Sequence, residues 1–296
     1  MDAPRKSDLA VTKANAPRAG VVGWPIEHSR SPMIHGYWLK EWGILGSYEK
    51  FAVRPGEFPE FAAKIREGEL VGANVTVPHK EVAFSACDGR TPVAEALGAV
   101  NTLWRERNRL IGDNTDVAGF LANMDEAAPG WAGRKKVAVV IGAGGAARAI
   151  VYALVQRGFE RVAIANRTQV RAEAIAAHFG GSLKATPWGH LPRASAEADL
   201  LVNASSLGMV GQPPLEIDLS GLSRHAVVAD AVYVPLRTPL IETARARGLR
   251  TVEGLGMLLH QAAPAFARWF GRQPIVTSEL RKLVEADVAA TYGDPR

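Results

Sequence analysis

A glycine-rich segment in the middle of the chain has the spacing of a phosphate-binding loop. Residues 136–141 (KVAVVI) predict a buried parallel strand, and residues 148–156 predict a helix. The sequence between them fits the G-x-G-x-x-G/A pattern in the strand–loop–helix context that this pattern requires. Its first glycine permits a tight turn, its second lets the backbone approach a pyrophosphate, and its last alanine lets helix and strand pack closely. A diphosphate on the helix N-terminus would contact Gly142, Ala143, Gly144, Gly145, Ala146 and Ala147.

The end of the next predicted strand distinguishes between the two nicotinamide dinucleotides. Residues 161–165 (RVAIA) run into Asn166, Arg167 and Thr168, and Arg171 follows. A site for NAD usually has an acidic residue here for the ribose 2′-hydroxyl, whereas arginine favours a 2′-phosphate. The sequence therefore predicts NADP as the cofactor. The alternative is an ordinary turn with both arginines in solvent, which leaves the three glycines after so apolar a strand unexplained.

Four polar clusters outside this segment carry groups suited to a polyhydroxylated acid. Two serines precede a predicted helix, where hydroxyl and backbone N–H groups can bind a carboxylate. An amide and a hydroxyl share one face of a predicted strand, and a lysine follows its end. An Asn-Thr pair follows another apolar run, and an Asp-Asn-Thr-Asp run stands at a crossover between two halves of the chain. The residues are Ser29 and Ser31, then Asn74, Thr76 and Lys80, then Asn101 and Thr102, then Asp113, Asn114, Thr115 and Asp116.

Together these clusters supply donors, a cation and carboxylates, which are the groups needed to hold a hydroxylated acid and move a proton. Each cluster by itself is also compatible with a structural role. Ser31 would then be a helix N-cap followed by a proline, and Lys80 a solvated side chain.

Composition indicates a globular protein that binds small molecules. The 296 residues suit one large domain or two ordinary ones, with 47% hydrophobic and 22% charged residues. The net charge of +5 suits anionic ligands, and the scattered basic residues argue against nucleic acid. No apolar run approaches the ~20 residues of a membrane span, and no histidine or cysteine pattern indicates a metal. Cys87 is the only cysteine, which favours a reducing compartment such as the cytoplasm.

Strand and helix patterns predict an α/β protein of two domains. Residues 1–17 are expected to be a disordered leader. Residues 18–115 alternate strands and helices and end in a hairpin, which predicts a substrate-binding domain. Residues 116–253 predict a Rossmann-type NADP-binding domain with strands near 137, 162, 183, 200 and 227. Two C-terminal helices within residues 254–296 have apolar faces that would return to complete the first domain.

The ordered motifs resemble the shikimate dehydrogenase family. The likeness covers roughly residues 19–271; one departure is Gly36, where many members carry Asn, and the segment before Arg18 is longer than the family requires. The matching segments are GWPIEHSRSPMIH (23–35), NVTVPHK (74–80), GAVNT (98–102), DNTD (113–116), the glycine loop, NRT (166–168), NASSLGM (203–209), DAVYVP (230–235) and GLGMLLHQ (254–261).

The resemblance implies roles for residues at the matching positions. Lys80 and Asp116 would be the catalytic pair. Two serines would bind the substrate carboxylate, and further hydroxyl and amide groups would bind its ring hydroxyls. The substrate set is Ser29, Ser31, Asn74, Thr76, Lys80, Asn101, Asp116, Tyr233 and Gln261. Beyond the glycine loop, the cofactor set is Asn166, Arg167, Thr168 and Arg171 at the 2′-phosphate, and Met209, Gly254 and Met257 near the nicotinamide.

The activity that the resemblance implies is NADPH-dependent, reversible reduction of 3-dehydroshikimate to shikimate, in aromatic amino-acid biosynthesis. One alternative is a quinate/shikimate dehydrogenase. Another is a non-catalytic NADP-binding sensor, which the presence of both Lys80 and Asp116 disfavours. The sequence leaves open whether Lys80 or a Lys80–Asp116 relay carries the proton, and whether the protein is a monomer or a homodimer.

Overall fold

The computed structural model describes residues 16–293, so residues 1–15 of the predicted leader lie outside the described part. The chain divides into two compact units, and each is described by itself. Unit 1 comprises the described residues up to Asp113 and a C-terminal piece, Pro264–Pro274. Unit 2 comprises Asn114–Ala263 and the described residues from Ile275. Residues 254–296, which the sequence assigns to the first domain, are thus divided between the two units.

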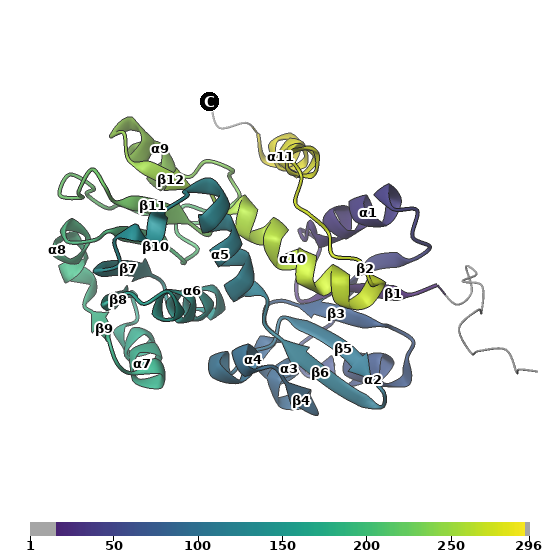
Figure 1. Cartoon of the computed structure of the whole chain (residues 1–296). Helices are drawn as coiled ribbons and strands as arrows, with labels where there is room; N and C mark the ends of the chain where they lie inside the picture. Colours follow the sequence, from purple (N-terminus) through teal and green to yellow (C-terminus); the bar gives the residue numbers. More distant parts are fainter. Residues whose placement is uncertain (1–15, 294–296) are drawn as a thin grey trace, which may run out of the picture. The chain divides into compact units, whose positions relative to one another are not determined.

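Unit 1 is built on one mixed sheet of six strands (Figure 1). Its strands are β1 (Arg18–Gly23), β2 (Ser47–Ala52), β3 (Gly72–Val75), β4 (Gly89–Arg90), β5 (Thr102–Glu106) and β6 (Arg109–Asp113), and its helices are α1 (Ser31–Glu41), α2 (Phe58–Glu67), α3 (Lys80–Ala86) and α4 (Pro92–Leu97). The strand order is β2-β1-β3-β5-β6-β4. Strand β1 runs parallel to β2 and β3, whereas β5 is antiparallel to β3 and β6. The predicted hairpin is therefore confirmed.

In unit 1, the end of α2 is as the sequence predicts, whereas the predicted N-cap of α1 is not. Helix α2 ends as predicted at Gly68, whose φ of +86° favours glycine. Ser31, however, is not the N-cap of α1: Arg30 occupies that position, and no side chain caps the helix. The Ser29 hydroxyl instead accepts a hydrogen bond from the Ser31 N–H at 3.3 Å. The capping role that competed with a binding role for Ser31 is therefore wrong.

Aromatic packing explains why a C-terminal piece belongs to unit 1. The piece includes the end of α10 (Leu255–Phe270). His35 stacks on Tyr48 with ring centres 3.9 Å apart, and Phe266 lies on the same cluster. Trp269 donates its indole N–H to the Leu103 carbonyl at 2.9 Å. Burying these rings removes a large apolar area from water and fixes the helix end to the sheet.

Unit 2 is built on a second six-stranded sheet that is parallel throughout. Its strands are β7 (Val137–Ile141), β8 (Arg161–Ala165), β9 (Leu183–Thr186), β10 (Leu200–Asn203), β11 (Val227–Asp230) and β12 (Arg250–Val252). Its helices are α5 (Asp116–Ala127), α6 (Gly145–Gln156), α7 (Gln169–Phe179), α8 (Leu191–Ala196), α9 (Pro239–Ala246), the start of α10 and α11 (Ser278–Tyr292), with short 3-10 turns η1 (Trp131–Gly133) and η2 (Trp188–His190). Five of the six strands match the predicted positions, and β12 is additional.

The order of these strands marks where a ligand belongs. The sheet reads β12-β11-β10-β7-β8-β9, so the chain moves outward from β7 in one direction and then returns to β10 for the other. This is the doubly wound order, in which the direction of growth reverses between β7 and β10. Helices α5 and α6 lie side by side next to it (Figure 1). Ligands of such sheets bind outside the carboxyl ends of the strands at the reversal.

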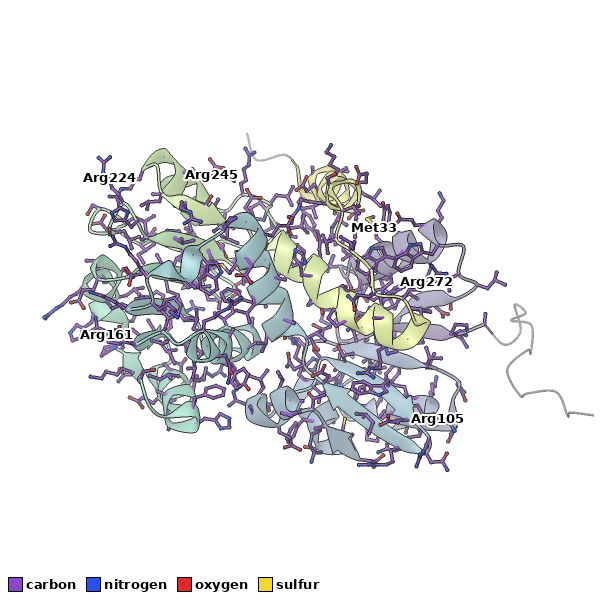
Figure 2. All side chains as sticks on the ribbon, in the orientation of Figure 1. Met33, Arg105, Arg161, Arg224, Arg245 and Arg272 are labelled. Atoms are coloured by element: carbon purple, nitrogen blue, oxygen red, sulfur yellow. The ribbon has the colours of Figure 1, made fainter. Side chains whose placement is uncertain are left out.

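Basic side chains of unit 2 project from separate elements (Figure 2). Arg161 begins β8 and pairs with Glu197, and Arg245 on α9 lies 2.7 Å from Glu253. Such exposed pairs contribute about 0–1 kcal/mol each, so they add little to the stability of the fold.

Within residues 16–293, no helix has both the length and the apolar character needed to cross a bilayer.

We expect unit 1 to lose stability in acid through His35. Burial lowers the pKa of His35 from 6.5 to about 3, so the folded unit excludes the proton that the unfolded chain binds. The contribution of neutral His35 to the free energy of unfolding should therefore be fully present above pH ~6.5. It should be lost progressively as the pH drops toward 3, and the loss should be about 2 kcal/mol at pH 5. Urea unfolding of wild type and His35→Phe at pH 7 and pH 5 measures this. The variant keeps a ring and should lose less stability between the two pH values; an equal loss would contradict the assignment.

Candidate functional site

The first glycine of the loop is held in a conformation that only glycine adopts readily. Gly142 follows β7 with a φ of +118°, and its N–H donates to the Ala165 carbonyl at 2.8 Å. A Cβ added to Gly142 would lie 2.7 Å from the Ala204 carbonyl oxygen, closer than real Cβ contacts. The loop after β7 and the loop after β10 therefore touch at the reversal of the sheet, as the phosphate-loop interpretation requires.

The second glycine leaves open space at the start of α6. Gly144 is the N-cap, no side chain caps it, and no protein atom lies within 4 Å of an added Cβ. The first-turn N–H groups of a helix have no partner within the helix, and they carry the positive end of its dipole. Ala147 is fully buried, as predicted for the position where helix and strand pack closely. The loop thus fits a diphosphate in shape and in charge.

The turn after β8 and the first turn of α7 present two exposed arginines. Asn166 donates from Nδ2 to the Thr168 carbonyl at 2.9 Å, and the Arg171 N–H donates to the same carbonyl at 3.1 Å. These bonds close a turn after the strand, and Arg167 lies within that turn. Arg167 and Arg171 are solvent-exposed, so both guanidinium groups are accessible to a phosphate.

A buried polar network lies beneath the loops after β10 and β11. Asn203 is fully buried and donates from Nδ2 to the Asp230 carboxylate at 2.9 Å, while its Oδ1 accepts from the Ser205 hydroxyl at 2.7 Å. Asp230 also accepts from the Val232 N–H at 2.9 Å and from the Thr238 hydroxyl at 2.6 Å. Burial raises the pKa of Asp230 to about 6, although these hydrogen bonds oppose the shift. The network fixes both loops at the carboxyl edge of the sheet.

Close backbone contacts join the same loops to the start of α10. The Val210 N–H donates to the Val234 carbonyl at 2.9 Å. A Cβ on Gly254 would lie 2.5 Å from the Val232 carbonyl, so Gly254 has a packing requirement in addition to its predicted cofactor role. The predicted site residues on these connected segments are Met209, Tyr233 and Gly254.

Helices α5 and α10 place two further predicted site residues in unit 2. Asp116 is the first residue of α5, and its N–H donates to the Asn114 side chain at 3.1 Å. Thr115 approaches the Gln261 side-chain oxygen at 3.4 Å. A Cβ on Gly119 would lie 2.6 Å from Gln261 Cβ and 2.8 Å from the Met257 carbonyl, so the two helices are in backbone contact there. Asp116 and Gln261 are thus held on adjoining helices.

Unit 1 gathers its predicted site residues at one edge of its sheet. Parallel strands β1 and β3 end together, with Val22 opposite Val75, and antiparallel β5 begins there, with Asn74 opposite Thr102. Backbone bonds continue this order past the strands: the Val100 N–H donates to the Lys80 carbonyl at 3.0 Å. The residues brought to this edge are Asn74, Thr76, Lys80 and Asn101, while Ser29 and Ser31 lie at the start of α1, which follows β1 in the chain. Lys80 belongs to unit 1 and Asp116 to unit 2, so the proposed catalytic pair is divided between the units.

Tyr48, which the sequence did not single out, is hydrogen-bonded to a predicted site residue. Tyr48 is buried in β2, and its hydroxyl donates to Asn74 Oδ1 at 2.7 Å. In the sequence this tyrosine is only the start of an apolar strand pattern. The one available signal is the alternation of β2, which turns Tyr48 to the buried side of the strand.

No metal site accompanies these groups in residues 16–293, where no cluster of three or more His, Cys, Asp and Glu side chains could hold an ion.

The fold and the site define a two-unit dinucleotide-dependent α/β enzyme. One unit has a doubly wound parallel sheet with a glycine loop at its reversal, and the other is an α/β unit with polar groups at one sheet edge.

Comparison with known proteins identifies the family. The shikimate dehydrogenase substrate binding domain matches residues 21–103, shikimate / quinate 5-dehydrogenase matches residues 127–209, and the shikimate 5′-dehydrogenase C-terminal domain matches residues 254–275. Shikimate dehydrogenase (NADP(+)) of Methylocella silvestris is 60% identical over 93% of this chain and 98% of its own length. The enzyme of the same name from Azorhizobium caulinodans is 56% identical over 92% and 97%.

Solved structures agree with the sequence relatives. Shikimate 5-dehydrogenase of Thermus thermophilus, in complex with NADP(H) and shikimate, has a TM-score of 0.81 and 36% identity over 92% of this chain and 99% of its own. Quinate dehydrogenase of Corynebacterium glutamicum, in complex with NAD, has a TM-score of 0.84 and 31% identity over 92% and 99%. The chain belongs to the shikimate dehydrogenase family, which confirms the resemblance and the predicted fold class.

Replacing the two loop glycines by alanine should affect different properties: cofactor binding at Gly144 and stability at Gly142. Gly144→Ala meets no protein atom, so we expect a stability change within about 1 kcal/mol but at least a tenfold weaker binding of NADP⁺, because the methyl group occupies space for the diphosphate. Gly142→Ala should cost about 2 kcal/mol or more, because strain at positive φ adds to the contact with Ala204. Calorimetric binding and urea unfolding measure both. Normal NADP⁺ binding by Gly144→Ala would exclude this loop as the diphosphate site.

Proposed function

We propose that this protein catalyses the reversible, NADPH-dependent reduction of 3-dehydroshikimate to shikimate. The observation that carries the proposal is the near-full-length identity of 56–60% with proteins named shikimate dehydrogenase (NADP(+)). The presence of a hydroxyl, amide, ammonium or carboxylate group at every predicted substrate position supports it. An initial-rate assay with shikimate or quinate, each against NADP⁺ or NAD⁺, tests it directly. Shikimate with NADP⁺ should be the preferred pair, and a preference for quinate with NAD⁺ would favour the alternative activity.

Unit 2 is proposed to bind the cofactor and unit 1 most of the substrate. The glycine loop would hold the diphosphate on the N–H groups of α6. Arg167 and Arg171 would form charge-assisted bonds with the 2′-phosphate, flanked by Asn166 and Thr168. The nicotinamide would lie at Met209, Gly254 and Met257. The match of the substrate binding domain to residues 21–103 supports this division.

The substrate is proposed to bind through hydrogen bonds from the predicted polar side chains. The hydroxyls of Ser29 and Ser31 would donate to its carboxylate, because an ionised acceptor strengthens such bonds. Thr76, Asn101 and Gln261 would bind the ring hydroxyls, with Tyr233 nearby. Asn74 is buried and bonded within unit 1, so its proposed role is to support the pocket.

Lys80 is proposed to exchange the proton of the reaction. When bound, NADPH supplies a hydride to the carbonyl carbon of 3-dehydroshikimate. The carbonyl oxygen then needs one proton, and a lysine side chain, ordinarily an ammonium ion at neutral pH, can donate it. Asp116, the second member of the proposed pair, would help to return a proton from solvent. In the reverse direction, neutral Lys80 or a Lys80–Asp116 relay would accept the hydroxyl proton.

The cell compartment and assembly state complete the proposal. We infer that the protein works in the cytoplasm, because a biosynthetic NADPH-dependent reduction belongs where that cofactor is supplied, and the lone cysteine suits a reducing compartment. The proposed activity is compatible with either a monomer or a homodimer.

The cofactor preference should depend on Arg167. Arg167→Ala should raise KM for NADP⁺ by about 10–100-fold and leave KM for NAD⁺ within about twofold, because only NADP⁺ carries the 2′-phosphate. Arg193→Ala, an exposed arginine on α8, is the matched control and should change neither value. If both cofactors weaken equally in Arg167→Ala, the guanidinium does not recognise the 2′-phosphate.

Removal of the Lys80 amine should slow the chemical step. Lys80→Ala should lower kcat by about 10²–10⁴-fold and preserve NADP⁺ binding, because Lys80 lies in unit 1. Single-turnover formation of NADPH from saturating shikimate is the measurement, since slow product release could hide the defect in steady-state kcat. Lys64→Ala on α2 is an exposed control that should behave as wild type. An unchanged single-turnover rate in Lys80→Ala would reduce Lys80 to a binding residue.

A further inference from the structure

A chain of hydrogen bonds runs from Tyr48 through the predicted substrate edge of unit 1. The Tyr48 hydroxyl donates to Asn74 Oδ1 at 2.7 Å. Asn74 Nδ2 donates to Thr102 Oγ1 at 3.2 Å, and the Thr102 hydroxyl donates to Asn101 Oδ1 at 2.9 Å. Three strands supply the first three groups, and the chain ends on Asn101, just before β5, whose amide the proposed function assigns to substrate binding. We refer to Tyr48, Asn74, Thr102 and Asn101 as the Tyr48 relay.

The direction of the relay is fixed by a backbone carbonyl. Asn74 Nδ2 also donates to the Asn101 carbonyl at 3.3 Å, and a carbonyl can only accept. The Asn74 amide must therefore turn its NH₂ toward Asn101 and Thr102, and its oxygen toward Tyr48. The Tyr48 hydroxyl is then the donor to that oxygen. Thr102, having accepted from Asn74, uses its single proton for Asn101 Oδ1.

The relay determines which hydrogen-bonding group the Asn101 side chain presents at its end. Because Asn101 Oδ1 accepts from Thr102, the NH₂ group of the Asn101 side chain lies on the side away from Thr102. Asn101 would thus meet a ligand as a hydrogen-bond donor, and it would select a ligand oxygen that accepts. A hydroxyl or carbonyl oxygen of a cyclic polyol acid has this chemistry.

Burial makes the relay costly to break. All four residues are at most 8% exposed, so an unpaired group among them could not be satisfied by water. Burial also raises the pKa of Tyr48 well above its ordinary value, so the phenol keeps the proton that it donates. The ring of Tyr48 is stacked on His35, which restricts its movement.

We propose that Tyr48 is a positioning residue for substrate recognition, which acts by orienting the Asn74 amide and, through Thr102, the amide of Asn101. The inference rests on the proposed function for the identity of the substrate. Tyr48 itself would contact no reacting atom. Its effect is to hold the donor group of Asn101 in one orientation before the substrate arrives, which lowers the ordering cost of binding.

Tyr48→Phe tests the proposal because it removes one hydroxyl and keeps the stacked ring. We expect KM for shikimate to rise about tenfold, with kcat changed less than about threefold and KM for NADP⁺ within about twofold. Thr102→Val, which interrupts the relay at its third member, should give a similar rise, and Thr102→Ser should restore near-normal KM. The double variant Tyr48→Phe/Thr102→Val should be about as impaired as the worse single variant, since either change interrupts the same relay. Tyr152→Phe removes a phenol hydroxyl on α6 and should have no effect.

A lowered unfolding midpoint of Tyr48→Phe with unchanged KM for shikimate would overturn the proposal and leave Tyr48 a structural residue. Additive effects in the double variant would also overturn it, because independent residues add.

A measurement without turnover separates this inference from the proposed function. In substrate-free protein, NMR exchange of the Asn74 and Asn101 side-chain amide protons should become about tenfold faster in Tyr48→Phe, because the relay no longer protects them. Unchanged exchange would overturn the relay even in an enzyme that reduces 3-dehydroshikimate. Faster exchange in Tyr48→Phe, combined with a wild type that fails to oxidise shikimate, would instead reject the proposed function and retain the relay.

Discussion

The close approach of two loop backbones at Gly142 and Ala204 is the constraint on which the cofactor half of this protein depends. Parallel strands bring their carboxyl ends to one edge, and the connections after β7 and β10 separate there in opposite directions. The loops that follow can meet only because Gly142 has no Cβ and adopts a positive φ. A similar requirement holds in unit 1, where a Cβ on Gly23 would lie 2.5 Å from the Thr76 side chain.

Buried polar networks hold these edges in place. In unit 2, Asn203 and Asp230 bind the backbone of their own loops, and in unit 1 the Tyr48 relay binds three strands together. Every group in such a network must be paired, because a buried polar group without a partner costs about 1–3 kcal/mol. The same requirement that stabilises the fold therefore defines how donors and acceptors face the ligand.

Helix α10 contributes to both units by a change of its contacts along its length. Its start packs against α5 at Gly119, where Gln261 comes within reach of Thr115. Its end enters the aromatic cluster of His35 and Tyr48 in unit 1. Pro264, inside the helix, stands where the two sets of contacts divide. The division of α10 between the two units thus depends on tertiary packing, which no local sequence pattern reveals.

The sequence by itself determined the fold class, most of the strands, the glycine loop and the family, because these features are encoded by local spacing and by ordered motifs. Five strands of unit 2 follow from apolar runs, whereas β12, only three residues long, leaves too short a pattern. Ser31 shows the limit of local reasoning, since Ser-Pro suggests a cap that Arg30 occupies instead. Only the tertiary structure decided that Tyr48 bonds Asn74 and that the C-terminal segment divides between two units. Those outcomes depend on contacts between residues far apart in the chain, and packing and hydrogen-bond satisfaction determine them only once the sheets have formed.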